Sequence, residues 1–395
     1  MISLFSIARL PRIQFGAGAI AKLPDLAARY GSRVLLVTGA HSFDAAPYAA
    51  PLLAHLAERR LGCERVMVSG EPSPELVDAA VRQFKGAAID VVIGLGGGSA
   101  LDAAKAIAGL LKPGNSVMDH LEGVGPELPY CGPATPFIAV PTTAGTGSEA
   151  TKNAVLSRHG PDGFKKSFRD EALVAEIALV DPELLAGCPR ALIAANGMDA
   201  LTQLLESYVS TGANDVTDAL ALSGMRAARD GLLAWYEGGA AAPEAMSQMA
   251  YASLQSGICL AQTGLGSVHG LASPLGAYFP IGHGVVCGTL LAAATRINIA
   301  ALRARAPQSR ALAKYAEIGR LLSGRDGVSA EQDCDTLVAT LEDWTQRLAL
   351  PTLTSLGICA SDVRRIVAAS RGSSMKTNPI VLTDDEISAV VTTRM

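Results

Sequence analysis

The sequence predicts an α/β domain built on a parallel sheet, followed by a domain made only of helices. Short apolar runs rich in β-branched residues alternate with helical patterns in the first part of the chain, as expected for strands joined by crossover helices. After Asp181-Pro182 these runs disappear, and long segments rich in Ala, Leu and Met take over. At 395 residues the chain also exceeds what one hydrophobic core usually serves. We therefore expect two domains, at residues 1–185 and 186–395.

The individual elements follow from the same patterns. The predicted strands are Arg33–Thr38, Glu64–Ser69, Asp90–Leu95, Phe137–Val140 and Ile177–Val180. The clearest helical patterns are Tyr48–Arg60, Pro74–Lys85, Ala194–Ser210 and Thr217–Tyr236. The glycine-rich stretch Glu237–Pro243 predicts a loop between two helices.

Composition excludes several classes of protein. The net charge is −4 and no stripe of Lys and Arg is present, so nucleic acid is not an expected partner. The seven cysteines are scattered and form no C-x-x-C pair, which indicates free thiols in a reducing compartment such as the cytoplasm. The first residues lack the basic start of a secretory signal peptide.

The stretch from Ala245 to Thr295 contains no Asp, Glu, Lys or Arg, yet it holds His269 and His283. Glutamine, proline and glycine interrupt it, so we expect a buried core and no membrane span. A buried imidazole needs a polar partner, and each of the two histidines is followed by a glycine that permits close approach. For either histidine alone, a satisfied core position explains the pattern as well as a metal ligand does.

A glycine-rich turn follows the third predicted strand, as Gly96-Gly97-Gly98-Ser99. Glycines between a strand and a helix let backbone N–H groups approach a phosphate at the positive end of that helix. The spelling departs from G-x-G-x-x-G, because Ser99 stands where the last glycine belongs, so a turn that only packs the helix on the strand is the alternative. A second polar loop, Pro141–Glu149, follows another strand, and paired loops at strand ends are where open α/β sheets bind ligands.

A possible metal site combines the two histidines with Asp199 and Gln203. The latter two stand four residues apart, so on a helix both side chains share one face. The histidines are fourteen residues apart, about 21 Å on one straight helix, so the chain must turn back between them. We expect the break at Pro274, Gly276, Pro280 and Gly282. A carboxylate, two imidazoles and an amide oxygen suit Fe²⁺ or Zn²⁺ with an open position for substrate.

Six blocks along the chain resemble the iron-containing (group III) alcohol dehydrogenase family. They are GGGSALDAAK (96–105), PTTAGTGSEAT (141–151), ALVDPELL (178–185), GMDALTQ (197–203), VHGLASPLG (268–276) and GHGVVCGTLL (282–291). The resemblance implies a dehydroquinate synthase-like fold with an N-terminal dinucleotide-binding domain and a helical metal-binding domain. It also implies a pyrophosphate site at Gly96, Gly97, Gly98 and Ser99, a cofactor site lined by Asp102, Thr142, Thr143 and Thr146, and a ribose contact from Lys165.

The resemblance carries Asp199, His269 and His283 over as metal ligands without change. Gln203 stands where many members have histidine, Ser273 where members often have a further histidine, and Gly282 where proline is usual. The change to Gln203 therefore affects how strongly a metal binds and which metal it is, and the change to Ser273 affects the path by which a proton leaves.

The end of the first predicted strand bears on the choice between NAD and NADP. A carboxylate there binds the adenosine ribose hydroxyls and repels a 2′-phosphate. The strand runs into Gly39-Ala40-His41-Ser42 without an acid. This leaves Gly39 and Ser42 as candidate cofactor contacts and leans toward NADP.

The resemblance implies an oxidoreductase that transfers hydride between NAD(P)(H) and a small alcohol or aldehyde polarised by a bound divalent metal. No side chain stands out as a general base. The alternative is a metal-independent reductase resembling maleylacetate reductases, which Gln203 keeps open. A lyase of the dehydroquinate synthase type fits less well, because the surroundings of both histidines lack the basic residues that a phosphate-bearing substrate needs. The family also suggests a homodimer, formed through the region from Phe5 to Phe15.

Overall fold

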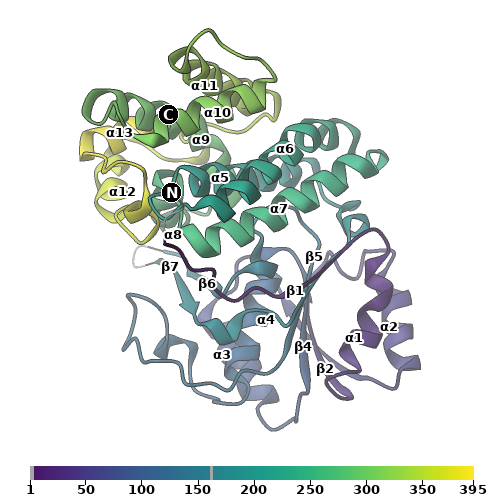
Figure 1. Ribbon diagram of the computed structural model, residues 1–395. Coiled ribbons are helices and arrows are strands. Elements are labelled where there is room, and N and C mark those ends of the chain that lie inside the picture. The colour runs from purple at the N-terminus through teal and green to yellow at the C-terminus, as the bar shows by residue number, and fades with distance from the viewer. Residues whose placement is uncertain (1–3, 161–162) are drawn as a thin grey trace. The chain divides into compact units, whose positions relative to one another are not determined.

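The computed structural model describes residues 4–160 and 163–395, which form two compact units (Figure 1). The α/β unit comprises residues 8–158 and 163–188. The helical unit comprises residues 189–395 together with the described residues 4–7 and 159–160.

The α/β unit is built on a six-stranded parallel sheet in the order β1-β8-β5-β4-β2-β3. Its strands are β1 (Arg12–Phe15), β2 (Arg33–Gly39), β3 (Gly62–Val68), β4 (Val91–Gly96), β5 (Phe137–Pro141) and β8 (Ile177–Val180). The five predicted strands each lie within two residues of the observed bounds. The predicted fold class, a parallel α/β sheet followed by helices, is confirmed.

Helices cover both faces of this sheet, so the central strands are buried throughout. The helices are α1 (Leu23–Ala27), α2 (Ala49–Glu58), α3 (Pro74–Phe84) and α4 (Gly98–Leu110). Alternate strand residues point to opposite faces. Leu36 and Ile93 pack with α1 and α2, whereas Leu35 and Val92 pack with α3 and α4.

Two features of the α/β unit lie outside the sequence prediction. One is the edge strand β1, whose four residues are too few to show a pattern. The other is an antiparallel hairpin of β6 (Asn153–Arg158) and β7 (Phe164–Arg169), separate from the main sheet. β7 reads FKKSFR, and two adjacent lysines obscure its alternation.

The helical unit carries the second half of the chain. Its helices are α5 (Arg190–Val209), α6 (Asp215–Gly238), α7 (Pro243–Thr263), α8 (Ser267–Tyr278), α9 (His283–Arg305), α10 (Arg310–Ser323), α11 (Ala330–Arg347), α12 (Val363–Ala369) and α13 (Asp384–Thr392). Short 3₁₀ turns of the helical unit occupy Gly239–Ala241, Thr354–Leu356, Ala360–Asp362 and Ser374–Thr377. Those of the α/β unit occupy Ala19–Lys22, Val117–Asp119, Ser148–Ala150, Glu171–Leu173 and Pro182–Leu185. The predicted loop at Glu237–Pro243 coincides with the connection between α6 and α7.

The charge-free stretch forms most of α7, all of α8 and the first half of α9. By length and composition α9 is apolar enough to cross a membrane, but 78% of that window is buried inside the structure. Its apolar surface is therefore satisfied by packing against other helices of the unit.

The break between the two histidines agrees with the sequence prediction in part, because Pro280 and Gly282 lie in the observed turn. Pro274 and Gly276 lie inside α8, which continues to Tyr278, and the chain turns only at Phe279–Gly282. A proline inside a helix costs about 3 kcal/mol. Here α8 buries Leu271 and Leu275 completely, and burying two such side chains contributes about 3–6 kcal/mol, enough to offset that cost.

Candidate active site

Three helices of the helical unit bring a carboxylate and two imidazoles together. Asp199 lies on α5, His269 near the start of α8, and His283 is the first residue of α9. Asp199 Oδ1 lies 3.3 Å from His269 Nε2 and 3.8 Å from His283 Nε2. The turn between α8 and α9 therefore brings His283 back beside His269, as a shared metal site requires.

The donor set fits a divalent cation. Asp199 is 1% exposed, and among the described residues its Oδ1 makes no hydrogen bond. Burial alone raises the pKa of Asp199, but the imidazoles of His283 and His269 hold it below its usual value. A buried, ionised oxygen without a hydrogen bond costs several kcal/mol unless a cation satisfies it.

Glu206, which the sequence analysis did not single out, orients His269. Its carboxylate is buried and accepts hydrogen bonds from the backbone N–H of Gly266 (3.0 Å) and Val268 (2.7 Å). It also lies 2.7 Å from His269 Nδ1. When Nδ1–H donates to this carboxylate, Nε2 is left facing Asp199 as a ligand. The sequence signal that could have identified Glu206 is its position on α5, seven residues or two helical turns after Asp199.

The surroundings also determine the charge of His269. Burial alone lowers the pKa of this imidazole, but its contacts with Cys287, Asp199 and Glu206 raise it well above the usual value. The pocket therefore favours positive charge at this point. A metal dication supplies the same charge in place of the proton.

Gln203 lies beside Asp199 on α5, as its spacing predicts. Its Nε2 lies 3.3 Å from Asp199 Oδ2, and its Oε1 accepts a hydrogen bond from Ser256 Oγ at 2.7 Å. The amide thus presents its donor side to the carboxylate and its oxygen to α7.

Cys287 on α9 is a further side chain at this point that the sequence analysis did not single out. Its Sγ lies 3.7 Å from the Nε2 atoms of both His269 and His283. One ligand atom each from Asp199, His269, His283 and Cys287 lie within 4.8 Å of one another. Burial raises the pKa of the Cys287 thiol to about 12, so without a metal it stays protonated.

In the α/β unit, the two predicted ligand loops meet at the ends of β4 and β5. A Cβ on Gly97 would lie 3.3 Å from Thr143 Oγ1, and one on Gly98 would lie 2.7 Å from Thr146 Cγ2. The backbone N–H of Thr142 donates to the Gly96 carbonyl at 2.9 Å. The glycines are therefore required where one loop packs on the other.

The helix that follows has the features of a phosphate site. Helix α4 begins at Gly98, directly after Gly97, and Ser99 lies in its first turn. Its N-cap residue, Gly97, has no side chain with which to cap the first N–H groups. Such uncapped N–H groups at the positive end of a helix are suited to a pyrophosphate.

Gly39 and Ser42 lie together at the neighbouring end of β2, where a Cβ on Gly39 would lie 2.6 Å from Ser42 Oγ. An acid does occur nearby: Asp44 pairs with Arg65 of β3 at 2.6 Å. The same guanidinium donates from Nε to Thr38 Oγ1 at 2.9 Å. This end of the sheet therefore offers both a carboxylate and a guanidinium, and they neutralise each other.

Asp102 and Lys165 are engaged in contacts within the α/β unit. The Asp102 carboxylate accepts hydrogen bonds from Ser148 Oγ (2.5 Å) and the Val155 N–H (3.2 Å). Lys165 Nζ forms an ion pair with Glu71. Asp102 thus ties α4 to the Pro141–Glu149 loop, and Lys165 ties β7 to Glu71 in the segment that precedes α3.

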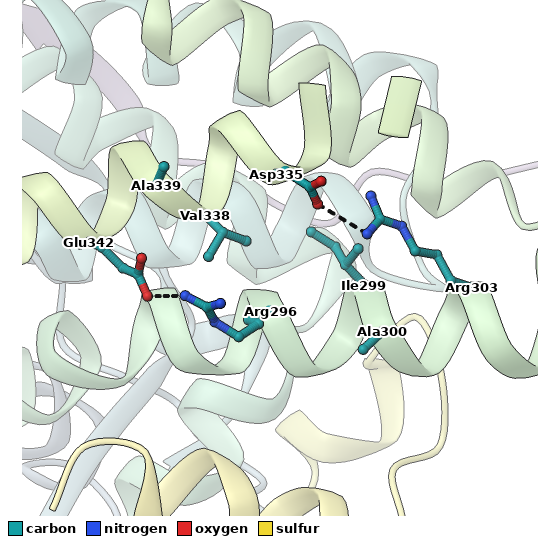
Figure 2. Close-up of a pocket in the computed structure, with 8 residues that line it drawn as sticks. All are labelled: Arg296, Ile299, Ala300, Arg303, Asp335, Val338, Ala339 and Glu342. Atoms are coloured by element: carbon teal, nitrogen blue, oxygen red, sulfur yellow. Dashed lines mark hydrogen bonds and ion pairs between the residues drawn. The ribbon is translucent and has the colours of Figure 1, made fainter. Parts of the chain in front are cut away.

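A surface groove of about 320 Å³ in the helical unit lies between α9 and α11, away from these residues. Figure 2 shows that Arg296 pairs with Glu342 and Arg303 with Asp335 across it. Its charges are already neutralised within the groove, and none of its lining residues belongs to the cluster of metal-ligating side chains.

Comparison with known proteins agrees with this arrangement. The model of the iron-containing alcohol dehydrogenase family matches residues 11–182, and that of the family's C-terminal domain matches residues 193–395. Alcohol dehydrogenase 4 of Saccharomyces cerevisiae is 30% identical over 381 residues, covering 95% of each chain. NADPH-dependent butanol dehydrogenase of Clostridium saccharobutylicum is 30% identical over 397 residues, covering 96% of each.

A solved structure shows the same fold from end to end. Sulfoacetaldehyde reductase of Bifidobacterium kashiwanohense, in complex with NAD⁺, superimposes with a TM-score of 0.85 at 26% identity and covers 99% of each chain. The chain therefore belongs to the iron-containing alcohol dehydrogenase family and is an NAD(P)-dependent oxidoreductase of small alcohols and aldehydes.

Proposed function

We propose that Asp199, His269 and His283 hold the divalent ion that this family uses, and that residues 186–395 form the metal- and substrate-binding domain. The observation that carries this proposal is the convergence of one buried carboxylate oxygen and two imidazole Nε2 atoms from three helices. Gln203, the fourth ligand expected from the sequence, lies beside Asp199 on the same helix.

When bound, the ion supplies a Lewis acid that polarises the substrate oxygen during hydride transfer. The protein orients the ligands and keeps water away. Glu206 holds the His269 ring by its Nδ1, and the charge-free stretch from Ala245 to Thr295 lowers the local dielectric. No side chain is assigned as a general base. Ser273 lies four residues after His269 on the same face of α8, and we expect the proton to leave past its hydroxyl.

For residues 1–185 we propose the cofactor-binding domain. The turn at Gly96, Gly97, Gly98 and Ser99 would bind the pyrophosphate at the start of α4, while Thr142, Thr143 and Thr146 line the site. Asp102 would contribute by holding the Pro141–Glu149 loop in place through its hydrogen bond from Ser148. Lys165 would contribute from its position in the ion pair with Glu71. Gly39 and Ser42 would lie at the adenosine ribose.

For the cofactor itself we favour NADP. The strand end at Gly39–Ser42 has no acid, and the Arg65 guanidinium nearby suits a 2′-phosphate. That guanidinium is paired with Asp44 in the structure, and a 2′-phosphate would take the place of this carboxylate. A higher kcat/KM with NADPH than with NADH on the same aldehyde is the expected result. A preference for NADH would contradict it.

We also propose that the enzyme is a cytoplasmic homodimer joined along β1. Among the described strands β1 stands at the edge of the sheet, next to β8, and an edge strand is a natural site for pairing with a second chain. Ile13 and Phe15 on it are 38% and 40% exposed. Light scattering of the purified protein should give twice the chain mass of 40.6 kDa, and a monomer would overturn this part.

The function is tested by following NADPH and NADH oxidation on short unbranched aldehydes before and after a strong chelator. We expect activity that is lost on chelation and restored by Zn²⁺ or Fe²⁺. Activity that is indifferent to chelation would instead favour the metal-independent, maleylacetate reductase-like alternative.

A further inference from the structure

The candidate metal site contains a thiol that the sequence-based ligand set leaves out. Cys287 is fully buried and lies one helical turn after His283 on α9, so both side chains share one face of that helix. His269 and Asp199 reach the same point from α8 and α5. All four donors are thus held by long, packed helices rather than by loops.

The spacing of these atoms is close to that of ligands around one ion, since all four lie within 4.8 Å of one another. Zinc bond lengths imply edges of about 3.3 Å between nitrogen and oxygen ligands, and about 3.6 Å between nitrogen and sulfur ligands, for a tetrahedral site. The observed separations are 3.3 and 3.8 Å from Asp199 Oδ1 to the two Nε2 atoms, and 3.7 Å from Cys287 Sγ to each of them.

Gln203 is occupied in a different way. Its Oε1 accepts a hydrogen bond from Ser256 on α7, and its Nε2 faces Asp199 Oδ2. Turning the amide to present its oxygen to a metal would bring that oxygen near the carboxylate and replace this donor with an acceptor. The present contacts hold Asp199 so that its other oxygen, Oδ1, points at the imidazoles and the thiol.

We propose that Cys287 is the fourth protein ligand of the metal, and that Gln203 is a positioning residue that orients Asp199. The inference rests on the proposed function, because it assumes that the Asp199, His269 and His283 site holds a divalent ion. On loading, the Cys287 S–H bond is exchanged for a sulfur–metal bond, and one proton is released to solvent. A thiolate ligand favours Zn²⁺ over the harder Fe²⁺ in this chain.

The experiment is X-ray absorption spectroscopy of the full-length protein loaded with one equivalent of Zn²⁺. We expect one sulfur scatterer at about 2.3 Å, together with nitrogen and oxygen at about 2.0–2.2 Å. The variant Cys287→Ser should lose the sulfur shell and weaken Zn²⁺ binding by more than about 100-fold, since loss of an outer-shell partner alone costs about 10–100-fold. The matched control is Cys259→Ser, a fully buried thiol on α7 whose Sγ contacts the Thr217 carbonyl. It should keep both the sulfur shell and the affinity.

The possible outcomes separate the two proposals. A zinc shell of nitrogen and oxygen alone would overturn the role of Cys287 and leave the metal-dependent function standing. Failure of the folded wild-type protein to bind Zn²⁺ or Fe²⁺ at all would overturn the proposed function itself. If Cys287→Ser does not fold, the spectra of the wild-type protein and Cys259→Ser still decide the question. Weaker Zn²⁺ binding by Gln203→Ala with the sulfur shell retained would support its role in orienting Asp199, whereas an unchanged affinity would remove that role.

Discussion

At the scale of single residues, the metal site depends on buried charges that are held by neighbours rather than by water. Glu206 is the clearest case, because its carboxylate accepts from two backbone N–H groups and lies beside His269 Nδ1. Neither Glu206 nor Cys287 was predicted from the sequence. Their positions depend on the turn between α8 and α9, which brings three helices together and which no local pattern specifies.

Replacing Glu206 with Gln should weaken metal binding without abolishing folding. The amide keeps one acceptor oxygen but turns an NH₂ group toward backbone donors, so His269 loses its fixed orientation. We expect Zn²⁺ affinity to fall by about 10–100-fold, measured by competition with a chromophoric chelator. The neighbouring Ser207→Ala is the control, since that buried hydroxyl makes no hydrogen bond in the described structure. Equal affinities for Glu206→Gln and the wild-type protein would contradict this account.

Glu149 should make the stability of the protein depend on pH. Burial raises its pKa from 4.5 to about 7. The folded state therefore holds this proton more tightly than the unfolded state, so its contribution is present below about pH 4.5 and is lost as pH rises to about 7. The loss is on the order of 3 kcal/mol. Denaturant titrations at several pH values should show a flatter profile for Glu149→Gln than for the wild-type protein. The exposed Glu64→Gln should keep the wild-type slope, and parallel profiles for all three proteins would argue against this assignment.

At the scale of elements, one lysine fastens the polar loop to α4. Lys105 is 1% exposed, and its Nζ donates to the Ser148 carbonyl and hydroxyl, Thr151 Oγ1 and the Asn153 carbonyl at 2.8–3.0 Å. Burial lowers its pKa to about 8, although Asp102 and Glu149 oppose the shift. The sequence placed Lys105 on the helix after the glycine turn, but nothing local predicted that its side chain ends under the next loop.

Changing Lys105 to Met should destabilise the protein by about 3–5 kcal/mol, because Asp102 loses its cation and four acceptors lose a donor. The denaturant midpoint measures this loss. The exposed Lys112→Met serves as the control and should change stability by no more than about 0.5 kcal/mol. Similar midpoints for the two variants would show that the buried network contributes little.

The glycine turn makes a prediction about the cofactor. A Cβ on Gly98 would lie 2.7 Å from Thr146 Cγ2, which forces the two loops apart at the start of α4. Gly98→Ala should therefore weaken NADPH binding by at least about tenfold, roughly 1.4 kcal/mol. Fluorescence titration measures the dissociation constant. Gly86→Ala is the control, because a Cβ there meets no atom within 4 Å. Unchanged binding by Gly98→Ala would argue against this turn as the pyrophosphate site.

At the scale of the whole molecule, the class of fold could be read from the sequence because strand and helix patterns alternate in the first half and only helical patterns follow in the second. Apolar runs rich in β-branched residues identified five strands to within two residues, whereas β1 and the β6–β7 hairpin are too short or too polar to be recognised. The prediction that Pro274 and Gly276 break the helix was wrong, because packing overrides local helix propensity in α8, whereas Pro280 and Gly282 do lie in the turn. The blocks that resemble the family supplied Asp199, His269 and His283, whereas the positions of Glu206 and Cys287 around them depend on tertiary contacts.

The central claim is that these three side chains hold a catalytic metal. It is tested most directly by the metal content of the purified protein, compared with that of His269→Ala under the same conditions. We predict about one Zn or Fe per chain for the wild-type protein. The variant should retain its circular dichroism spectrum while losing both the metal and aldehyde reduction. A metal-free wild-type protein with full activity, or a variant that keeps its metal as tightly, would contradict it.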